Sequence, residues 1–334
     1  MKIAIVGLGY WGPNLLRNFS SLADTQCILY DANKEALERY HKLYGHPIAN
    51  SYEEILADQS IDGVVIATPV ETHFSLASDA MNAGKHVFVE KPMTYHPEES
   101  EKLVQIAQQC NKKLFVGHVF LYNPAVLQIK KWIDEQYLGE LIYIHSMRTN
   151  FGPIRKDVDV LWDLCPHDIS MFSYWCGSNA TSVSANAQKH LPHDKNDVVF
   201  NTIHYENNIS AHCHASWITP KKIRQVFVIG SERMLSWDDM NLQEPIRIYN
   251  RGIGHDHLKD LDFSQYIASI GDGDIHIPKI PHGEPLKNEC MAFIDYCEGK
   301  SKALSDGQNG LDIVKTMHAL EQSINQQGTK VDIT

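Results

Sequence analysis

The first twelve residues constrain the fold more than any other part of the chain. Ile3–Val6 is a short apolar run that predicts a buried strand and is too short to span a membrane. It ends at Gly7, Gly9 and Gly12, which are spaced as G-x-G-x-x-G, and helical spacing of apolar residues follows. A strand, a glycine turn and a helix in this order are typical of a dinucleotide-binding fingerprint.

Each of these glycines has its own physical reason. Gly7 permits a tight turn, Gly9 lets the backbone approach a pyrophosphate, and Gly12 allows the helix to pack closely on the strand. The free amides and the positive dipole at the start of the helix would hold the phosphates. We therefore expect the whole loop to contact the cofactor, through Gly7, Leu8, Gly9, Tyr10, Trp11 and Gly12.

An acidic residue completes the fingerprint. Thr25–Tyr30 predicts the next strand, and Asp31 follows it. A carboxylate at this strand end can accept hydrogen bonds from both ribose hydroxyls, and it would repel a 2′-phosphate. The alternative is a strand that ends in a solvated aspartate. Because no Arg or Lys follows immediately, the pattern predicts NAD as the cofactor.

Length, charge and cysteine content limit the classes of function. A chain of 334 residues has room for two domains, and a net charge of −11 argues against nucleic acid or an anionic membrane as a partner. The seven cysteines are scattered and include no Cys-x-x-Cys pair, which favours reduced thiols. The N-terminus has no secretory pattern, so we expect a cytoplasmic protein.

The two parts of the chain differ in their pattern of predicted strands and helices. Residues 1–122 alternate short strands with helices, which predicts an α/β domain with a doubly wound parallel sheet, the Rossmann fold. Residues 123–334 contain long alternating strands, which predict an α+β domain with a large, mostly antiparallel sheet and one helical face. Residues 251–283 lack periodicity and are interpreted as a long ordered loop. We expect NAD binding in the first domain, and substrate binding and oligomerisation in the second.

Lys91 stands at the predicted edge of the parallel sheet. Ligands of such sheets bind beyond the carboxyl ends of the strands. Lys91 follows the predicted strand of residues 85–89, and Pro92 biases it away from helical geometry. The alternative, a solvated lysine in a loop, is less favoured at this position. The predicted strands of the first domain end at Gly7, Asp31, Thr68, Glu90 and His118.

A second candidate pair lies further along the chain. Asp163 and His167 are four residues apart, so a helix that begins near Asp163 would carry both on one face. Pro166 would then lie in the first turn, where its missing amide costs nothing. Asp163 is equally explained as a helix cap and His167 as a packed core histidine. Taken alone, these alternatives outweigh catalysis.

The remaining polar clusters are weaker. His212 and His214 are two residues apart in a predicted strand, so both imidazoles lie on the same face. Without a nearby third ligand they predict no metal site. His255 and His257 are interpreted as solvated. Several polar residues before the helix of Asp163 would meet an anionic substrate or form a solvated loop: Arg148, Asn150, Arg155 and Lys156.

Taken together, the motifs resemble one family. Their ordered set resembles the glucose–fructose oxidoreductase / inositol dehydrogenase family of two-domain NAD(P)-dependent sugar dehydrogenases. The resemblance covers nearly the whole chain, including Glu284-Pro285-Leu286 and Asp306-Gly307 near the C-terminus. The motifs that carry it are Gly7-x-Gly9-x-x-Gly12, Ala67-Thr68-Pro69, Glu90-Lys91-Pro92 and Asp163-x-x-x-His167.

The resemblance implies roles for particular residues. Lys91 and His167 would contact the reacting hydroxyl, and Asp163 would assist. Many relatives carry an Arg where this chain has Leu121-Tyr122, so the substrate contacts differ there. The implied cofactor contacts outside the glycine loop are Asp31, Thr68, Pro69, His73, Glu90 and Lys91. The implied substrate contacts are His118, Tyr122, Asn123, Arg148, Arg155 and Trp162.

These roles define a reaction. Neutral His167 can act as the base for a secondary hydroxyl, and Lys91 can stabilise the developing alkoxide. We expect an NAD-dependent dehydrogenase that oxidises a ring hydroxyl of a sugar. Val160–Ser170 looks most like the branch that works on nucleotide-linked sugars, often at the 3-hydroxyl.

Other readings remain open. A keto-sugar reductase, a free polyol or inositol dehydrogenase, and a non-catalytic cofactor-binding regulator would share the fold. Retention of Lys91, Asp163 and His167 together argues against the regulator. Because the second domain has helices for one sheet face only, we also expect a homodimer or homotetramer paired through the other face.

Overall fold

The computed structural model describes residues 1–152, 154–155, 158–252 and 273–333. The chain forms two compact units, each described by itself below. The first unit comprises Met1–Asn123 and Gly283–His318. The second unit comprises Pro124–His282 and Ala319–Thr334.

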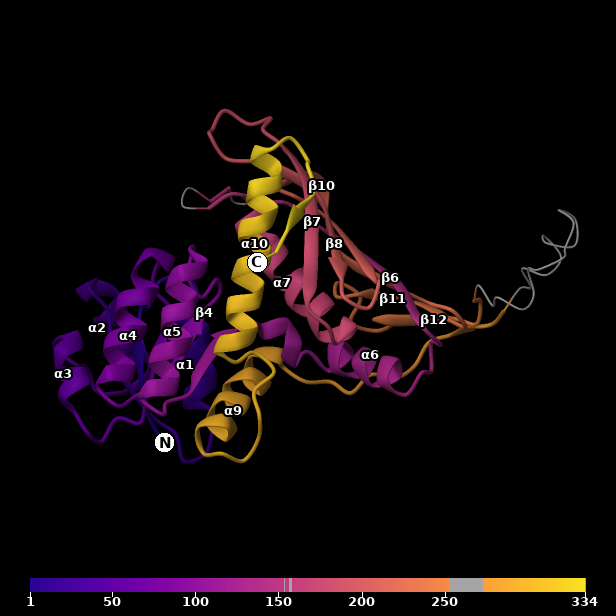
Figure 1. The fold of residues 1–334 in the computed structure, drawn as a ribbon. Helices are drawn as coiled ribbons and strands as arrows, with labels where there is room; N and C mark the ends of the chain where they lie inside the picture. Colours follow the sequence, from indigo (N-terminus) through magenta and orange to yellow (C-terminus); the bar gives the residue numbers. More distant parts are fainter. Residues whose placement is uncertain (153, 156–157, 253–272, 334) are drawn as a thin grey trace, which may run out of the picture. The chain divides into compact units, whose positions relative to one another are not determined.

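The first unit is built on a parallel sheet of five strands in the order β2-β1-β3-β4-β5. Figure 1 labels β4 of this sheet, together with the helices of the unit. The strands are short and apolar because helices cover both faces of such a sheet. The order reverses between β1 and β3, so the carboxyl ends of these two strands flank the switch point where ligands of doubly wound sheets bind. This confirms the predicted Rossmann domain. The strands are β1 (Lys2–Val6), β2 (Gln26–Tyr30), β3 (Gly63–Ile66), β4 (His86–Glu90) and β5 (Leu114–Gly117).

Helices form the crossovers of this sheet. Asn33 and Ser51 cap two of them by accepting hydrogen bonds from first-turn amides, as expected of Asn and Ser at a helix start. Two short 3-10 helices, η1 (Val70–Thr72) and η2 (Val119–Tyr122), follow β3 and β5. The crossover helices are α1 (Gly12–Ser20), α2 (Lys34–Tyr44), α3 (Tyr52–Ala57), α4 (His73–Asn82) and α5 (Pro97–Gln109).

A late segment of the chain completes the first unit. α9 (Pro285–Cys297) packs Phe293 against Phe19, Phe88 and Phe115, with ring centroids 5.6–6.1 Å apart. α10 (Gly307–Asn325) begins in the same unit. From the sequence, residues 123–334 were all predicted to belong to the second domain. The structure differs because the apolar face of α9 is buried by the core of the parallel sheet.

The second unit contains a nine-stranded sheet in the order β13-β12-β11-β10-β6-β9-β8-β7-β14 (Figure 1). The pairing is antiparallel except between β6 and β9, which confirms the predicted mostly antiparallel sheet. The first strands are β6 (Leu141–Phe151), β7 (Ala180–Gln188), β8 (Val198–Tyr205) and β9 (Ser210–Ser216). The others are β10 (Ile218–Gly230), β11 (Met234–Asp238), β12 (Ile246–Tyr249), β13 (Ile275–His276) and β14 (Val331–Asp332).

The two faces of this sheet differ. α7 (Val160–Cys176) packs against β6, β8 and β9 on one face, beside α6 (Pro124–Asp134). On β6 the buried residues Ile144 and Arg148 alternate with Tyr143, which is 44% exposed. Phe200 and Phe227 are also exposed. The face opposite α7 therefore presents aromatic side chains.

Two further observations concern the whole chain. Residues 253–272 of the predicted long loop, with His255 and His257, lie outside the described residues, and β13 pairs with β12 just after them. Within the described ranges, none of the helices combines the length and the hydropathy that a membrane span requires.

Candidate functional site

The glycine loop has the geometry that the fingerprint predicts. Gly7 has a φ of +95°, and a Cβ on it would lie 2.7 Å from the carbonyl oxygen of Ala67. A Cβ on Gly12 would lie 1.9 Å from the Gly7 oxygen, whereas no described atom lies within 4 Å of one on Gly9. The backbone is thus closely packed on the protein side and open beside Gly9. Of the remaining loop residues, Tyr10 is 93% exposed and Leu8 is buried.

The start of α1 is suited to an anion. Trp11 stands at its N-cap position, and none of the described side chains caps the helix there. First-turn amides have no partner within the helix, and the helix dipole favours negative charge at this end. This end of α1 therefore fits the pyrophosphate of a dinucleotide.

Asp31 is fixed against the glycine loop. Its Oδ2 accepts a hydrogen bond from the Leu8 amide at 2.5 Å, and its Oδ1 accepts one from the Asn33 amide at 2.6 Å. Each carboxylate oxygen can accept more than one hydrogen bond, so ribose hydroxyls remain acceptable partners. The loop and Asp31 together fit NAD.

His73 connects two of the loops at the sheet edge. It is buried, and its ring nitrogens lie 3.0 Å from the carbonyl oxygens of Thr68 and Pro92. Burial lowers the pKa of His73, so the ring is neutral. Thr68, whose hydroxyl lies 2.7 Å from that of Thr72, and Pro69 are more accessible. Both ring nitrogens of His73, a predicted cofactor contact, therefore lie within hydrogen-bond distance of backbone carbonyl groups of the protein.

Glu90 ends β4, and Lys91 follows it. Lys91 is half-buried, and its backbone amide donates to Oε2 of Glu90 at 3.2 Å. The Trp11 side chain also hydrogen-bonds to Glu90. Burial raises the pKa of Glu90 to about 7, although the Lys91 charge opposes the shift. The strand end thus holds a carboxyl group directly beside the candidate catalytic ammonium.

Two of the predicted substrate residues after β5 are buried. His118 is 1% exposed, and burial, followed by the nearby Lys91 charge, lowers its pKa to about 3. Tyr122 is 5% exposed, stacks on Phe115 and places its hydroxyl 3.0 Å from that of Ser305. Asn123 is half-buried. In the unit described here, Tyr122 is a core residue.

α7 carries the second part of the candidate site. It begins three residues earlier than predicted, because Asp159 caps it through a hydrogen bond from the Trp162 amide. Asp163 and His167 are therefore one turn apart on one face, and both are half-buried. Pro166 lies inside the helix, not in its first turn as the sequence analysis expected.

Asp163 is held from two sides. Its Oδ2 accepts a hydrogen bond from the indole N–H of Trp217 at 3.1 Å, and its Oδ1 pairs with Arg155 at 3.2 Å. Trp217 is 54 residues away from Asp163 in sequence. No local pattern could have assigned it to Asp163. Lys156, the neighbouring basic candidate, lies outside the described residues.

Arg148 differs from the prediction. It is 5% exposed, and its guanidinium pairs with Asp168 through contacts of 2.5 and 3.3 Å. The alternation of β6 turns it toward α7, so it is neither in a solvated loop nor open to a substrate. Trp162, another predicted substrate contact, is 6% exposed.

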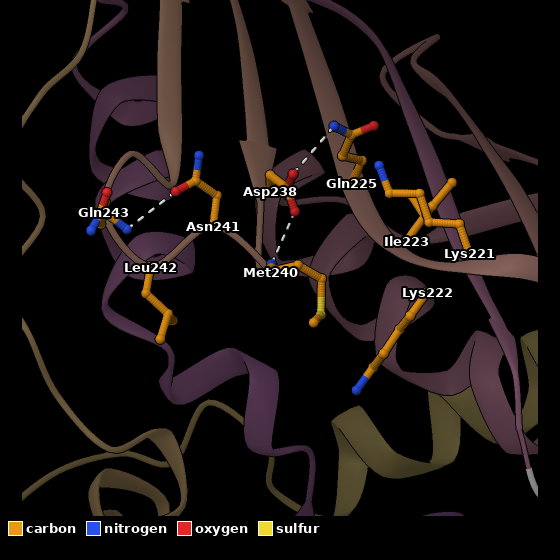
Figure 2. A pocket seen from close by; sticks show the side chains of 9 residues that line it. All are labelled: Lys221, Lys222, Ile223, Gln225, Asp238, Met240, Asn241, Leu242 and Gln243. Carbon is orange, nitrogen blue, oxygen red and sulfur yellow. Dashed lines mark hydrogen bonds between the residues drawn. The ribbon is translucent and has the colours of Figure 1, made fainter.

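A separate cavity opens on the other face of the second sheet (Figure 2). Gln225 and Ile223 alternate with the buried Val226 on β10, and Gln225 donates to Asp238 at 3.4 Å. None of the predicted site residues lines it. The lining consists of Lys221, Lys222, Ile223, Gln225, Asp238, Met240, Asn241, Leu242 and Gln243.

The candidate residues divide between the two units. The glycine loop, Asp31 and Lys91 belong to the first unit, and Asp163 and His167 belong to the second. Within the first unit, the predicted cofactor residues lie in the loops at the carboxyl ends of the strands. A Rossmann sheet with these loops defines the class of dinucleotide-binding domains.

The chain belongs to the GFO/IDH/MocA oxidoreductase family. A family model described as "Oxidoreductase family, NAD-binding Rossmann fold" matches residues 1–118. A second model, for the GFO/IDH/MocA C-terminal domain, matches residues 126–236. Together they match well over half of the chain, and they make it an NAD-binding oxidoreductase of the sugar and inositol dehydrogenase type.

Two characterised relatives show the range of this family. UDP-N-acetylglucosamine 3-dehydrogenase of Acidithiobacillus ferrooxidans is 28% identical over 255 residues, which are 76% of this chain and 78% of that protein. scyllo-Inositol 2-dehydrogenase (NAD(+)) of Bacillus subtilis is 28% identical over 197 residues, which are 56% of this chain and 57% of that protein.

Solved structures share the fold over the whole chain. The Acidithiobacillus ferrooxidans enzyme superimposes with a TM-score of 0.84 at 24% identity and covers 98% of both chains. GenD2 from gentamicin A biosynthesis, solved in complex with NAD, superimposes with a TM-score of 0.82 at 19% identity and covers 100% of this chain and 96% of its own.

Proposed function

We propose that this protein oxidises the 3-hydroxyl of a nucleotide-linked sugar to a ketone, with NAD as the hydride acceptor. The observation that carries the proposal is the arrangement on α7, where Asp163, held by Trp217 and Arg155, lies one turn before the half-buried His167. The nucleotide-sugar substrate is supported by the relative that acts on UDP-N-acetylglucosamine, whose match covers more of this chain than the inositol dehydrogenase match does.

The proposed roles follow from the chemistry of alcohol oxidation. Bound NAD supplies the hydride acceptor. Neutral His167 takes the hydroxyl proton, because its ordinary pKa lies near the working pH. The Lys91 ammonium stabilises the developing alkoxide. Asp163 binds a neighbouring hydroxyl of the sugar or orients the imidazole of His167. Its contacts with Trp217 and Arg155 keep its carboxylate in one position.

The proposal is tested by turnover with a panel of substrates. UDP-N-acetylglucosamine, myo-inositol and glucose are compared with NAD, and NADH absorbance is followed. Lys91→Ala and His167→Ala should each lower kcat about a hundredfold or more, with little change in NAD affinity. Lys102→Ala, an exposed substitution on α5, serves as the control. Near wild-type turnover in either site variant would refute its assigned role.

The substrate assignment has its own test. Turnover of only the free sugars would refute a nucleotide-linked substrate and leave the dehydrogenase assignment intact. Arg155 contacts Asp163 and is 44% exposed, so it can also reach a substrate. Arg155→Ala should therefore raise the KM for a nucleotide sugar more than the KM for a free sugar.

We also propose that the protein works in the cytoplasm as a homodimer or homotetramer. All seven cysteines, which lie in the described parts of the chain, are free thiols. This supports a reducing compartment. The exposed Tyr143, Phe200 and Phe227 on the sheet face opposite α7 support a second copy of the chain as its cover.

A further inference from the structure

Two carboxyl groups in the first unit are buried with oxygens that have no hydrogen-bond partner among the described residues. Glu289 on α9 is 0% exposed, and both of its oxygens lack a partner. Glu90 is 9% exposed, and its Oε1 lacks one. Burying an ionised carboxylate without partners is costly, so these atoms require an explanation.

The packing of α9 places these two side chains together. Phe293 of α9 packs on Phe88 of β4, with ring centroids 5.6 Å apart. Glu289 lies one helical turn before Phe293, about 6 Å along the axis. Glu90 lies two residues beyond Phe88 on the same side of the strand, about 6.6 Å along it. The electrostatic interaction between the two carboxyls agrees with this placement.

The neighbouring strand leaves room for the pair. Gly117 of β5 is in register with Glu90, and a Cβ there would lie 2.9 Å from Glu90 Oε1. Any larger residue at this position would displace the carboxyl group. The glycine at the end of β5 is thus explained by the Glu90 side chain rather than by a turn.

The charged and titratable groups around the pair determine its net charge. Lys91 interacts electrostatically with Glu90, whereas burial keeps His118 neutral. Burial also raises the pKa values of Tyr122 and Cys290, so both stay protonated. The titratable groups around the pair are therefore Lys91 after β4, His118 after β5, Tyr122 in η2 and Cys290 on α9.

We infer that Glu90 and Glu289 share one proton, so that the pair carries a single negative charge beside the Lys91 ammonium, and that Glu289 is thereby a positioning residue. One proton on the pair removes one of two buried negative charges, which would otherwise repel each other in a site that solvates neither. Loss of the shared proton would place a second negative charge beside Lys91 and oppose its stabilisation of an alkoxide. The catalytic part of this inference rests on the proposed role of Lys91.

The shared proton is tested without catalysis. Infrared difference spectra of the full chain, labelled with ¹³C-glutamate and titrated from acid to alkaline pH, report protonated carboxyl groups by their carbonyl stretch. We expect one wild-type glutamate to keep its proton above neutral pH, where the isosteric variant Glu289→Gln, which retains only Glu90 with its pKa of about 7, has lost most of this band. Glu298→Gln, which changes an exposed residue at the end of the same helix, should keep the band. Absence of the band from the wild type would overturn the inference.

The positioning role is tested by the pH dependence of kcat. In the wild type, loss of the shared proton should lower kcat above neutral pH. In Glu289→Gln the negative charge cannot exceed one, so this fall in kcat should be absent from the pH profile. A purely structural role would lower the melting temperature and leave both band and pH profile unchanged, which would contradict the inference. If no substrate is turned over, the infrared result still decides whether the proton is shared.

Discussion

The buried ion pair between Arg148 and Asp168 gives the most demanding prediction. Arg148 precedes the helix of the candidate catalytic residues in sequence and was expected to meet an anionic substrate. In the structure both charged groups are at least 94% buried, and the guanidinium makes two contacts with the carboxylate. We therefore expect Arg148 to determine the stability of the second unit.

The magnitude follows from the burial. Asp168→Asn or Arg148→Met removes one partner and leaves the other buried charge uncompensated, which costs about 3–5 kcal/mol. For a unit of this size, 1 kcal/mol corresponds to about 2–4 °C, so the melting temperature should fall by about 10 °C. The double variant Arg148→Met/Asp168→Leu should recover most of the loss, because no unpaired charge remains.

A matched pair on the same sheet serves as the control. Arg247 on β12 and Glu244 just before it are 3.0 Å apart and exposed, so Arg247→Met should cost about 1 kcal/mol or less. The assay is urea unfolding of all variants together with steady-state kinetics. An Arg148→Met variant with unchanged stability and a raised KM would show that Arg148 binds substrate, and would refute the reasoning.

Three further predictions follow from the first unit and from the open sheet face. Asp31→Ala should raise the preference for NADP over NAD, measured as a ratio of kcat/KM values, by about tenfold or more; an unchanged ratio would contradict the role of Asp31. Tyr143→Glu with Phe200→Glu should dissociate the proposed oligomer in analytical ultracentrifugation, whereas a wild-type monomer would refute the interface. The pKa of His118 is lowered to about 3 in the folded state, so stability should fall by about 1.4 kcal/mol per pH unit as pH drops below 6.5. His118→Gln should flatten that slope in urea unfolding.

Much of the first unit could be predicted because its rules are local. Gly7 and Gly12 each face a backbone oxygen that leaves no room for a side chain, and this requirement appears directly as glycine in the sequence. The loops of Asp31 and Lys91 share one sheet edge because the carboxyl ends of parallel strands do. Neither conclusion needed knowledge of distant contacts.

Distant contacts explain what the sequence could not show. Trp217, just after the end of β9, hydrogen-bonds to Asp163. α9 belongs to the first unit because Phe293 packs against Phe88 and Phe115. These partners are far apart in the chain, and neither spacing nor residue type distinguishes them from ordinary core aromatics. Likewise, the sequence shows Glu289 only as an acidic residue of a predicted helix, and its burial becomes visible only in the packed structure.

The polar contacts of α7 bear on how His167 can work. An apolar helix face can slide on a sheet with little change in buried area. An ion pair with two contacts, or a carboxylate hydrogen-bonded from two sides, instead fixes the helix in one position. α7 has such contacts on both sides of His167. Asp163 is held one turn before it, and Asp168 is held directly after it. A base must stand within hydrogen-bond reach of the proton that it removes. A buried ion pair contributes little net stability over an apolar pair. We therefore expect the buried charges of the second unit to fix the position of the candidate base.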